Sequence, residues 1–252
     1  MRVVCTLASG SGGNAVLIGS GHTYILVDAG ISAKRIHRAL WELGLSIENI
    51  VSVLVTHEHS DHIAGVPALR KNIYAPPLTA QAVRMRASFC RVEEITGAFA
   101  VGDINVTPFD TPHDAPDSLG FSFDLGGTRV VLCTDLGHVT QAVMQHAAQA
   151  DCLLIESNHD EAMLRAGPYP AFLKKRILGP RGHLSNEASA EVTAAAVCGG
   201  ARHVALCHLS RENNRPELAE RVTARRLAEC GVTPGRDITL GAAPAAGIYR
   251  VM

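Results

Sequence analysis

The segment 56–62, with the sequence THEHSDH, carries a dense group of potential metal ligands. Its imidazole nitrogens and carboxylate oxygens, without any thiolate, form a donor set that suits Zn, Mn or Fe. A helical zinc motif of the His-Glu-x-x-His type would need histidine at position 61, which is Asp, so that pattern is excluded. In a tight turn, two donors can face one ion and the other two a neighbouring ion. The candidate ligands in this segment are His57, His59, Asp61 and His62.

The elements that must position this segment follow a pattern of strands and helices in both halves of the chain. The ligand segment directly follows the apolar run 50–55, which predicts a strand buried on both faces. Residues 32–43 place their apolar side chains on one face, which predicts an amphipathic helix capped by Ser32. These patterns predict an α+β fold with two mixed sheets packed face to face and helices on the outer faces. No linker is visible, so we expect one domain over residues 1–252. Further helices are expected at 139–148, 187–197 (capped by Ser185 or Asn186) and 216–229, and further strands at 3–8, 15–19, 24–28, 104–109, 120–125, 129–134, 152–156, 203–207, 238–240 and 248–251, with a hairpin turn at Gly126-Gly127.

The motif THEHSDH resembles the signature of the metallo-β-lactamase-fold hydrolases. That resemblance implies an αββα sandwich with a one- or two-metal site at its edge and further ligands at the ends of later strands. His113, Asp135 and His208 each follow an expected strand, in the order of the family pattern. Taken alone, each also fits an ordinary role as a loop histidine, a helix cap or a buried strand-end histidine. The resemblance implies one metal held by His57, His59 and His113, a second held by Asp61, His62 and His208, and Asp135 as the bridge.

Two divalent ions about 3.5 to 4 Å apart can share a water, lower its pKa and so provide a bridging hydroxide as nucleophile. Flavodiiron relatives carry Glu where this chain has His59, so hydrolysis is favoured over redox iron chemistry. A proton is still needed for the leaving group. His183, in RGHLSNEAS, resembles a GHxS element of phosphodiesterase branches and is our candidate general acid; a structural histidine that caps a loop is the alternative. Asp61 is grouped with His183 as catalytic.

Several polar segments near expected strand ends are candidates for contacts with substrate or ligands. The loop 8–15, ASGSGGNA, is either a hairpin turn or an anion-binding nest that uses Ser9, Ser11 and Asn14. Asp28 ends an apolar strand, and the resemblance implies that its carboxylate orients a metal-bound histidine. Asn158 and His159 follow another strand as candidate substrate contacts, and an ordinary loop role is open for His159.

Within the fold, the chain is most similar to the YycJ/WalJ-like bacterial proteins. The motifs that carry this resemblance span residues 6 to about 215 and read SGSGGNA, LVDAG, THEHSDH, ESNHD, GHLSN and HLSRENN. Gly12 stands where the family usually has Ser. The resemblance implies a 5′ to 3′ exodeoxyribonuclease of DNA repair, with DNA as partner. The alternatives are a hydrolase of small esters, thioesters, lactones or cyclic phosphodiesters, and a metal-bound protein without catalytic activity.

Composition limits the partners of the chain. The 252 residues carry a formal net charge of −1, so no global attraction to a polyanion is expected. The 7 Cys have no paired spacing, which indicates reduced thiols. We expect a cytoplasmic protein, because no targeting segment and no apolar run near the roughly 20 residues of a membrane span is visible. Two basic stretches, either solvated surface or DNA contacts, contain Arg84, Arg86 and Arg91, and Arg165, Lys174, Lys175, Arg176 and Arg181.

Overall fold

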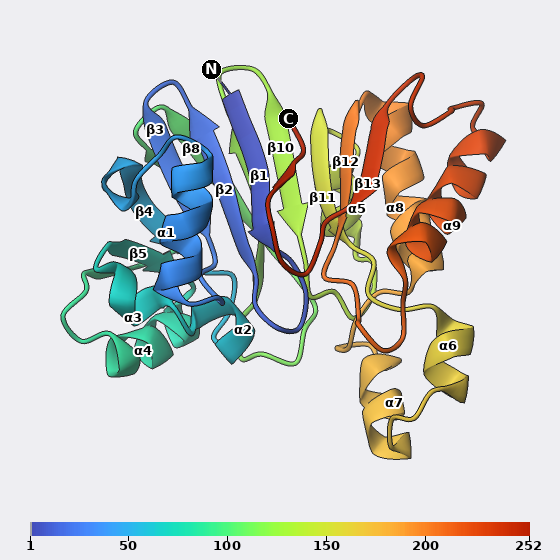
Figure 1. Ribbon diagram of the computed structural model, residues 1–252, viewed down its shortest axis with the longest axis horizontal. Coiled ribbons are helices and arrows are strands. Elements are labelled where there is room, and N and C mark those ends of the chain that lie inside the picture. The colour runs from blue at the N-terminus through green and yellow to red at the C-terminus, as the bar shows by residue number, and fades with distance from the viewer. Residues whose placement is uncertain (1) are drawn as a thin grey trace.

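The computed structural model describes residues 2–252. Within this range, two seven-stranded sheets pack face to face, and helices cover both outer faces (Figure 1). This arrangement is the αββα sandwich that the sequence predicts. The hairpin pattern at the start of each half and the strand-helix units that follow account for the mixture of antiparallel and parallel strands.

The first sheet has the strand order β14-β1-β2-β3-β4-β5-β6. Its strands pair antiparallel from β14 to β3 and parallel from β3 to β6. The strands are β1 (Arg2–Ala8), β2 (Ala15–Ser20), β3 (Thr23–Val27), β4 (Ile50–Leu54), β5 (Asn72–Ala75), β6 (Val92–Glu94) and β14 (Tyr249–Arg250). Three helices pack on its outer face: α1 (Ala33–Glu42), α3 (Val66–Leu69) and α4 (Pro77–Arg86).

The second sheet has the order β13-β12-β11-β10-β9-β8-β7. Its strands are antiparallel from β7 to β10 and parallel from β10 to β13. The strands are β7 (Phe99–Val101), β8 (Ile104–Asp110), β9 (Leu119–Asp124), β10 (Arg129–Cys133), β11 (Cys152–Glu156), β12 (His203–Cys207) and β13 (Thr239–Ala242). The outer helices are α5 (Gln141–Ala147), α8 (Asn186–Gly199) and α9 (Pro216–Glu229).

The apolar core has three layers, one between the sheets and one beneath each set of helices. Phe121 and Phe123 on β9 are fully buried in the central layer. Burial of one such side chain stabilises the fold by about 1.5–3 kcal/mol. The sandwich is therefore a rigid support for the loops at its edges.

The structure differs from the sequence expectations mainly where elements are short. Sequence patterns did not predict α2 (Ser60–Ile63), α3, α4, β5, β6, β7, α6 (Glu161–Ala166) or α7 (Ala171–Ile177). One helical turn or three residues of strand gives too few positions for a period to be visible. The longest of these elements, α4, has ten residues but buries only Thr79, Ala80 and Val83 and leaves Leu78 and Met85 exposed. Ser185 occupies the N-cap of α8 and accepts from the N–H of Ala188, whereas the Ser32 hydroxyl makes no capping hydrogen bond to α1. No helix within residues 2–252 is long and apolar enough to span a membrane.

Candidate metal centre and active site

The candidate ligands meet at one edge of the sandwich, in the turns that follow the strands. Asp28 follows β3, Asp135 follows β10 and His208 follows β12. All three have left-handed backbone, with φ of 59°, 59° and 55° respectively. This region is unfavourable for residues other than glycine and costs about 1–3 kcal/mol per residue when a fold enforces it. The strained turns direct these side chains from different strands toward a common point.

The first cluster joins His57 and His59 from the turn after β4 with His113 from the loop after β8. His57 Nε2 lies 3.0 Å from His59 Nδ1, and His113 Nε2 lies 3.3 Å from the same atom. Tetrahedral ligands at about 2.0–2.1 Å from a zinc ion are about 3.3–3.4 Å apart. The three ring nitrogens thus have the separation that a single cation requires.

The second cluster joins Asp61, His62 and His208. Asp61 Oδ2 lies 3.5 Å from His62 Nε2 and 3.6 Å from His208 Nε2. Asp135 lies between the two clusters, with Oδ2 3.3 Å from His62 Nε2 and Oδ1 3.9 Å from His113 Nε2. The structure therefore brings together all seven side chains that the sequence proposes as metal ligands.

The donor atoms fit divalent metals. Among the residues that the structure describes, the buried atoms Asp135 Oδ2 and His208 Nε2 have no hydrogen-bond partner, although an unpaired buried polar atom costs about 1–3 kcal/mol. A cation would satisfy both atoms. Nitrogen and oxygen donors without thiolate agree with Zn or Mn, and also with Fe.

Hydrogen bonds behind the ligands set the tautomers of the histidines. Asp28 Oδ2 is 2.7 Å from His62 Nδ1, and its carboxylate also accepts from the N–H and hydroxyl of Thr56. The Gly182 carbonyl accepts from His113 Nδ1 at 3.2 Å. In both rings the proton on Nδ1 leaves Nε2 free to bind a metal. Asp28 thus has the orienting contact that the family resemblance implies.

Glu156, at the end of β11, is a functional residue that sequence reasoning missed. Its Oε1 lies 2.7 Å from His183 Nδ1 and 2.9 Å from His208 Nδ1. Its Oε2 accepts from the backbone N–H groups of Leu136 and Leu184 at 2.7 and 3.1 Å. One fully buried carboxylate therefore orients both a candidate ligand and the candidate acid. The available signal was a charged residue ending an otherwise apolar parallel strand.

Burial and charge act in opposite directions on the pKa values of these groups. Burial alone would raise the pKa of Glu156, but the neighbouring His183 and the hydrogen bond from His208 lower it to about 2. Burial would lower the pKa of His183, but the charge of Glu156 and its hydrogen bond raise it. Burial together with the neighbouring His62 lowers the pKa of His57, which favours the neutral ring that a metal ligand needs. Burial would raise the pKa of Asp61, but the neighbouring His208 and His62 lower it.

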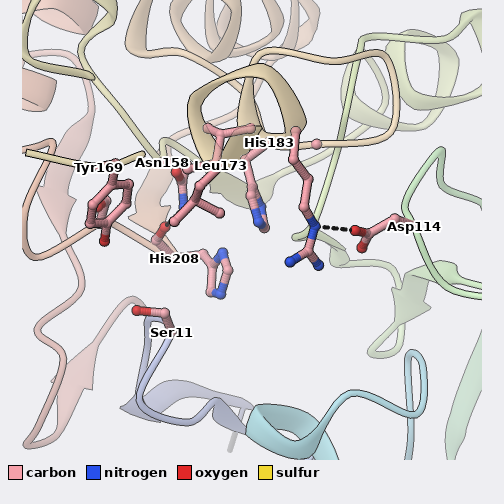
Figure 2. A pocket seen from close by; sticks show the side chains of 11 residues that line it. Ser11, Asp114, Asn158, Tyr169, Leu173, His183 and His208 are labelled. Atoms are coloured by element: carbon pink, nitrogen blue, oxygen red, sulfur yellow. Dashed lines mark hydrogen bonds and ion pairs between the residues drawn. The ribbon is translucent and has the colours of Figure 1, made fainter. Parts of the chain in front are cut away.

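A cavity of about 170 Å³ opens beside the two clusters of candidate metal ligands (Figure 2). His183 reaches it from the loop between α7 and α8, His208 from the end of β12, Ser11 from the glycine-rich loop after β1, and Asn158 from the loop after β11. The α6–α7 hairpin supplies the remaining wall. His183 Nδ1 is occupied by Glu156, so Nε2 is the ring atom that can act in the cavity.

The predicted substrate contacts divide into two groups. Ser11 and Asn158 line the cavity. Ser9 Oγ accepts from the N–H of His208, and Asn14 Oδ1 accepts from the N–H of Gly10 while its amide nitrogen faces His62 Nε2 at 3.2 Å. His159 is buried and does not line this cavity. The side chains of Ser9, Asn14 and His159 are thus surrounded by other groups of the protein, and their contact with substrate stays a prediction.

The basic stretches are largely occupied with structural contacts. Arg84 pairs with Glu94, Arg91 with Glu93 and Arg165 with Glu161. Lys174 donates to the Arg165 carbonyl, and Arg181 donates to the carbonyls of His113 and Ala115. Arg181 therefore holds the loop that presents a candidate ligand. Arg176 pairs with Asp114 at the rim of the cavity.

Comparisons with known proteins agree with this architecture. Residues 23–209 match the β-lactamase superfamily domain. The chain is 37% identical over 242 residues to exodeoxyribonuclease WalJ of Streptococcus pneumoniae, covering 92% of this chain and 90% of that protein. It is 35% identical over 238 residues to exodeoxyribonuclease YycJ of Bacillus anthracis, covering 91% and 90%. The crystal structure of the metallo-β-lactamase fold protein YhfI from Bacillus subtilis superposes with a TM-score of 0.72 at 15% identity, covering 99% of this chain and 100% of that one.

The chain therefore belongs to the β-lactamase superfamily. It is a hydrolase with the metallo-β-lactamase fold, and this fold implies the use of divalent metal. Its similarity to WalJ and YycJ extends over nearly the whole chain.

Proposed function

We propose that this chain is a dimetal phosphodiesterase, a 5′ to 3′ exodeoxyribonuclease that acts in DNA repair in the cytoplasm. One metallo-β-lactamase-like domain carries the activity. The observation that supports phosphodiester hydrolysis is the placement of His183 in the cavity beside two convergent ligand clusters, with Glu156 fixing its ring. The relatives WalJ and YycJ are named exodeoxyribonucleases, which favours DNA as the substrate.

One metal would be held by His57, His59 and His113 and the other by Asp61, His62 and His208, with Asp135 between them. When bound, such ions supply a nucleophile from water at neutral pH and stabilise the charge that develops at phosphorus. Asp28 and Glu156 keep the ligand rings in the required tautomers. Asp61 contributes to catalysis as a ligand of the second metal.

His183 provides the proton for the leaving oxygen. Glu156 accepts the hydrogen bond from Nδ1, and its charge favours the protonated imidazole, so Nε2 carries a proton that it can donate in the cavity. The rest of the ring is enclosed, with 21% of the side chain exposed, which excludes competing water from most of it. A positioned general acid of this kind contributes about 10²- to 10⁴-fold to the rate.

The test is an assay panel on purified protein with Mn, Zn or chelator. The substrates are 5′-phosphorylated and unphosphorylated DNA, RNA, bis-p-nitrophenyl phosphate and a thioester. We expect DNA to be degraded from its 5′ end with either metal. Thioester turnover without phosphodiester turnover would refute the nuclease and favour a small-ester hydrolase.

Two variants isolate the acid. His183→Ala should retain both metals and lose about 10²- to 10⁴-fold in kcat. His138→Ala is the matched control, because His138 is exposed and its Nδ1 donates only to the Pro180 carbonyl beside the same loop. An unchanged kcat in His183→Ala would remove this residue from the mechanism.

A further inference from the structure

The α6–α7 hairpin presents one chemically ordered stripe to the cavity. Leu173 and Arg176 line it from α7, where a spacing of three residues places them on one side of the helix, and Tyr169 lines it from the segment just before the N-cap of α7. Figure 2 shows the ring of Tyr169 at one end and Leu173 between it and the labelled His183. An aromatic ring, an aliphatic side chain and a guanidinium thus follow one another along the wall.

The backbone around Tyr169 is restrained by two prolines. Tyr169 lies between Pro168 and Pro170, and proline fixes its own φ and restricts the residue before it. Pro170 is the N-cap of α7, so the ring is fixed to the start of that helix. Its exposure is intermediate, and one side of the residue faces the cavity. A pre-organised aromatic face of this kind is suited to stacking against a planar base.

Arg176 is fixed at one atom and open at the others. Its Nε donates to Asp114 Oδ2 at 2.5 Å, and 58% of its side chain is exposed. Within the described part of the chain, its terminal guanidinium nitrogens have no hydrogen-bond partner. Such a fork matches the oxygen geometry of a phosphate.

The end of α7 is coupled to the candidate acid. The Ile177 carbonyl accepts from the N–H of His183, and a side chain at Gly182 would collide with the Ile177 and Arg176 carbonyls at 2.1 and 2.4 Å. Lys174 ties the same helix back to the Arg165 carbonyl. The stripe therefore has a fixed position relative to His183.

We propose that α7 and Tyr169, which precedes its N-cap, form the nucleotide-binding wall of the site: Tyr169 stacks on the base of the terminal nucleotide, Leu173 contacts its sugar, and Arg176 binds a backbone phosphate. This inference rests on the proposed function and adds the recognition of the strand end. Ser11, Asn158 and Ser210 supply polar groups around the same cavity. Binding of the strand end would then depend little on base identity, because every base has a face that can stack.

The base contact is tested with two oligonucleotides that differ only in an abasic residue at the end where degradation starts. The wild type should prefer the normal end by about 5- to 150-fold in kcat/KM, the range that base stacking on an aromatic side chain gives. Tyr169→Ala should lose this preference and Tyr169→Phe should keep it. Phe172→Ala is the matched control, because Phe172 is an aromatic residue of α7, three positions after Tyr169, that is 74% exposed and does not line the cavity.

The phosphate contact is tested by the salt dependence of kcat/KM. Arg176→Gln should reduce the slope against log salt concentration by about 0.7, the value for one phosphate contact on a single strand. Arg165→Gln, which removes an exposed arginine of α6 that pairs with Glu161, should leave the slope unchanged. An unchanged slope in Arg176→Gln would overturn the phosphate role.

Equal rates on normal and abasic ends in the wild type, or a preference that persists in Tyr169→Ala, would overturn the base contact while leaving the nuclease in place. No DNA degradation by the wild type would instead refute the proposed function and, with it, this inference.

Discussion

Replacement of Glu156 by Gln is the perturbation that most sharply tests how the site is organised. The backbone N–H groups of Leu136 and Leu184 can only donate, so the amide oxygen of Gln must face them. The amide NH₂ then faces Nδ1 of His183 and His208. Each ring can accept there only if its proton moves to Nε2. For His208 this is the wrong tautomer, because Nε2 is the atom that faces Asp61.

The magnitude follows from these contacts. Loss of a partner behind a metal ligand typically lowers metal affinity or activity about 10- to 100-fold. Loss of the protonated His183 removes a further factor of about 10²–10⁴ in kcat. The free energy of unfolding of the metal-free protein should fall by about 1–3 kcal/mol, the cost of an imperfectly satisfied buried group.

The pH dependence of kcat tests the role of Glu156 independently of the rate loss. Glu156 raises the pKa of His183, and a general acid must be protonated, so wild-type kcat is lost only as pH rises through this raised pKa. In Glu156→Gln the remaining activity should decline at lower pH. Metal content, kcat/KM on DNA and thermal unfolding are the assays. Glu161→Gln, at an exposed surface pair, is the control. Full metal content with unaltered kcat and pH profile in Glu156→Gln would refute this reasoning.

Three further predictions concern a tightly packed glycine, the buried thiols and the contact of Asp28 with the candidate ligand His62. Gly30→Ala should lower the free energy of unfolding by more than about 4 kcal/mol or abolish metal binding, because its Cβ would lie 1.5 Å from the Asp61 carbonyl oxygen. Gly12→Ala is the control: its Cβ meets only the flexible end of Arg211, so thermal unfolding should be nearly unchanged. Burial raises the pKa of Cys133, Cys152 and Cys207, the last to about 12. A thiol reagent at pH 8 should therefore react with exposed Cys198 in the native protein and with the three buried thiols only after unfolding. Fast labelling of the buried thiols in the native protein would contradict the core packing. Asp28→Asn should reduce metal affinity about 10- to 100-fold by releasing the ring of His62, measured by competition with a chelator, and wild-type affinity would contradict the orienting role.

The parts of the fold that repeat a clear period were predictable from sequence. The strand before the ligand segment, the helix α1 with its apolar face and the parallel strands β11 and β12 lie where apolar runs predict them. The region between His62 and Phe99 was not, because its helices and strands are short and α4 leaves Leu78 and Met85 exposed. Each of these elements buries at most three side chains, for example Ile73 and Ala75 of β5, so no period extends far enough to be visible in the sequence.

The candidate site could be predicted as far as residue types that bind metal stand out in a sequence. His113, Asp135 and His208 were identified by the family resemblance together with their place after strands, and they do meet the THEHSDH turn in space. Glu156 was missed because a single glutamate at the end of an apolar strand has no distinctive spacing. Tyr169 and Arg176 were missed as cavity residues because their position depends on how α7 folds back over the edge of the sheets.

The central claim is that this chain degrades DNA with two divalent metals. The most direct measurement is a titration of chelator-stripped protein with Mn or Zn, with degradation of 5′-labelled DNA as the signal. We expect no degradation without metal and full activity at two ions per chain. DNA degradation in the presence of chelator, or saturation with metal without any degradation, would contradict it.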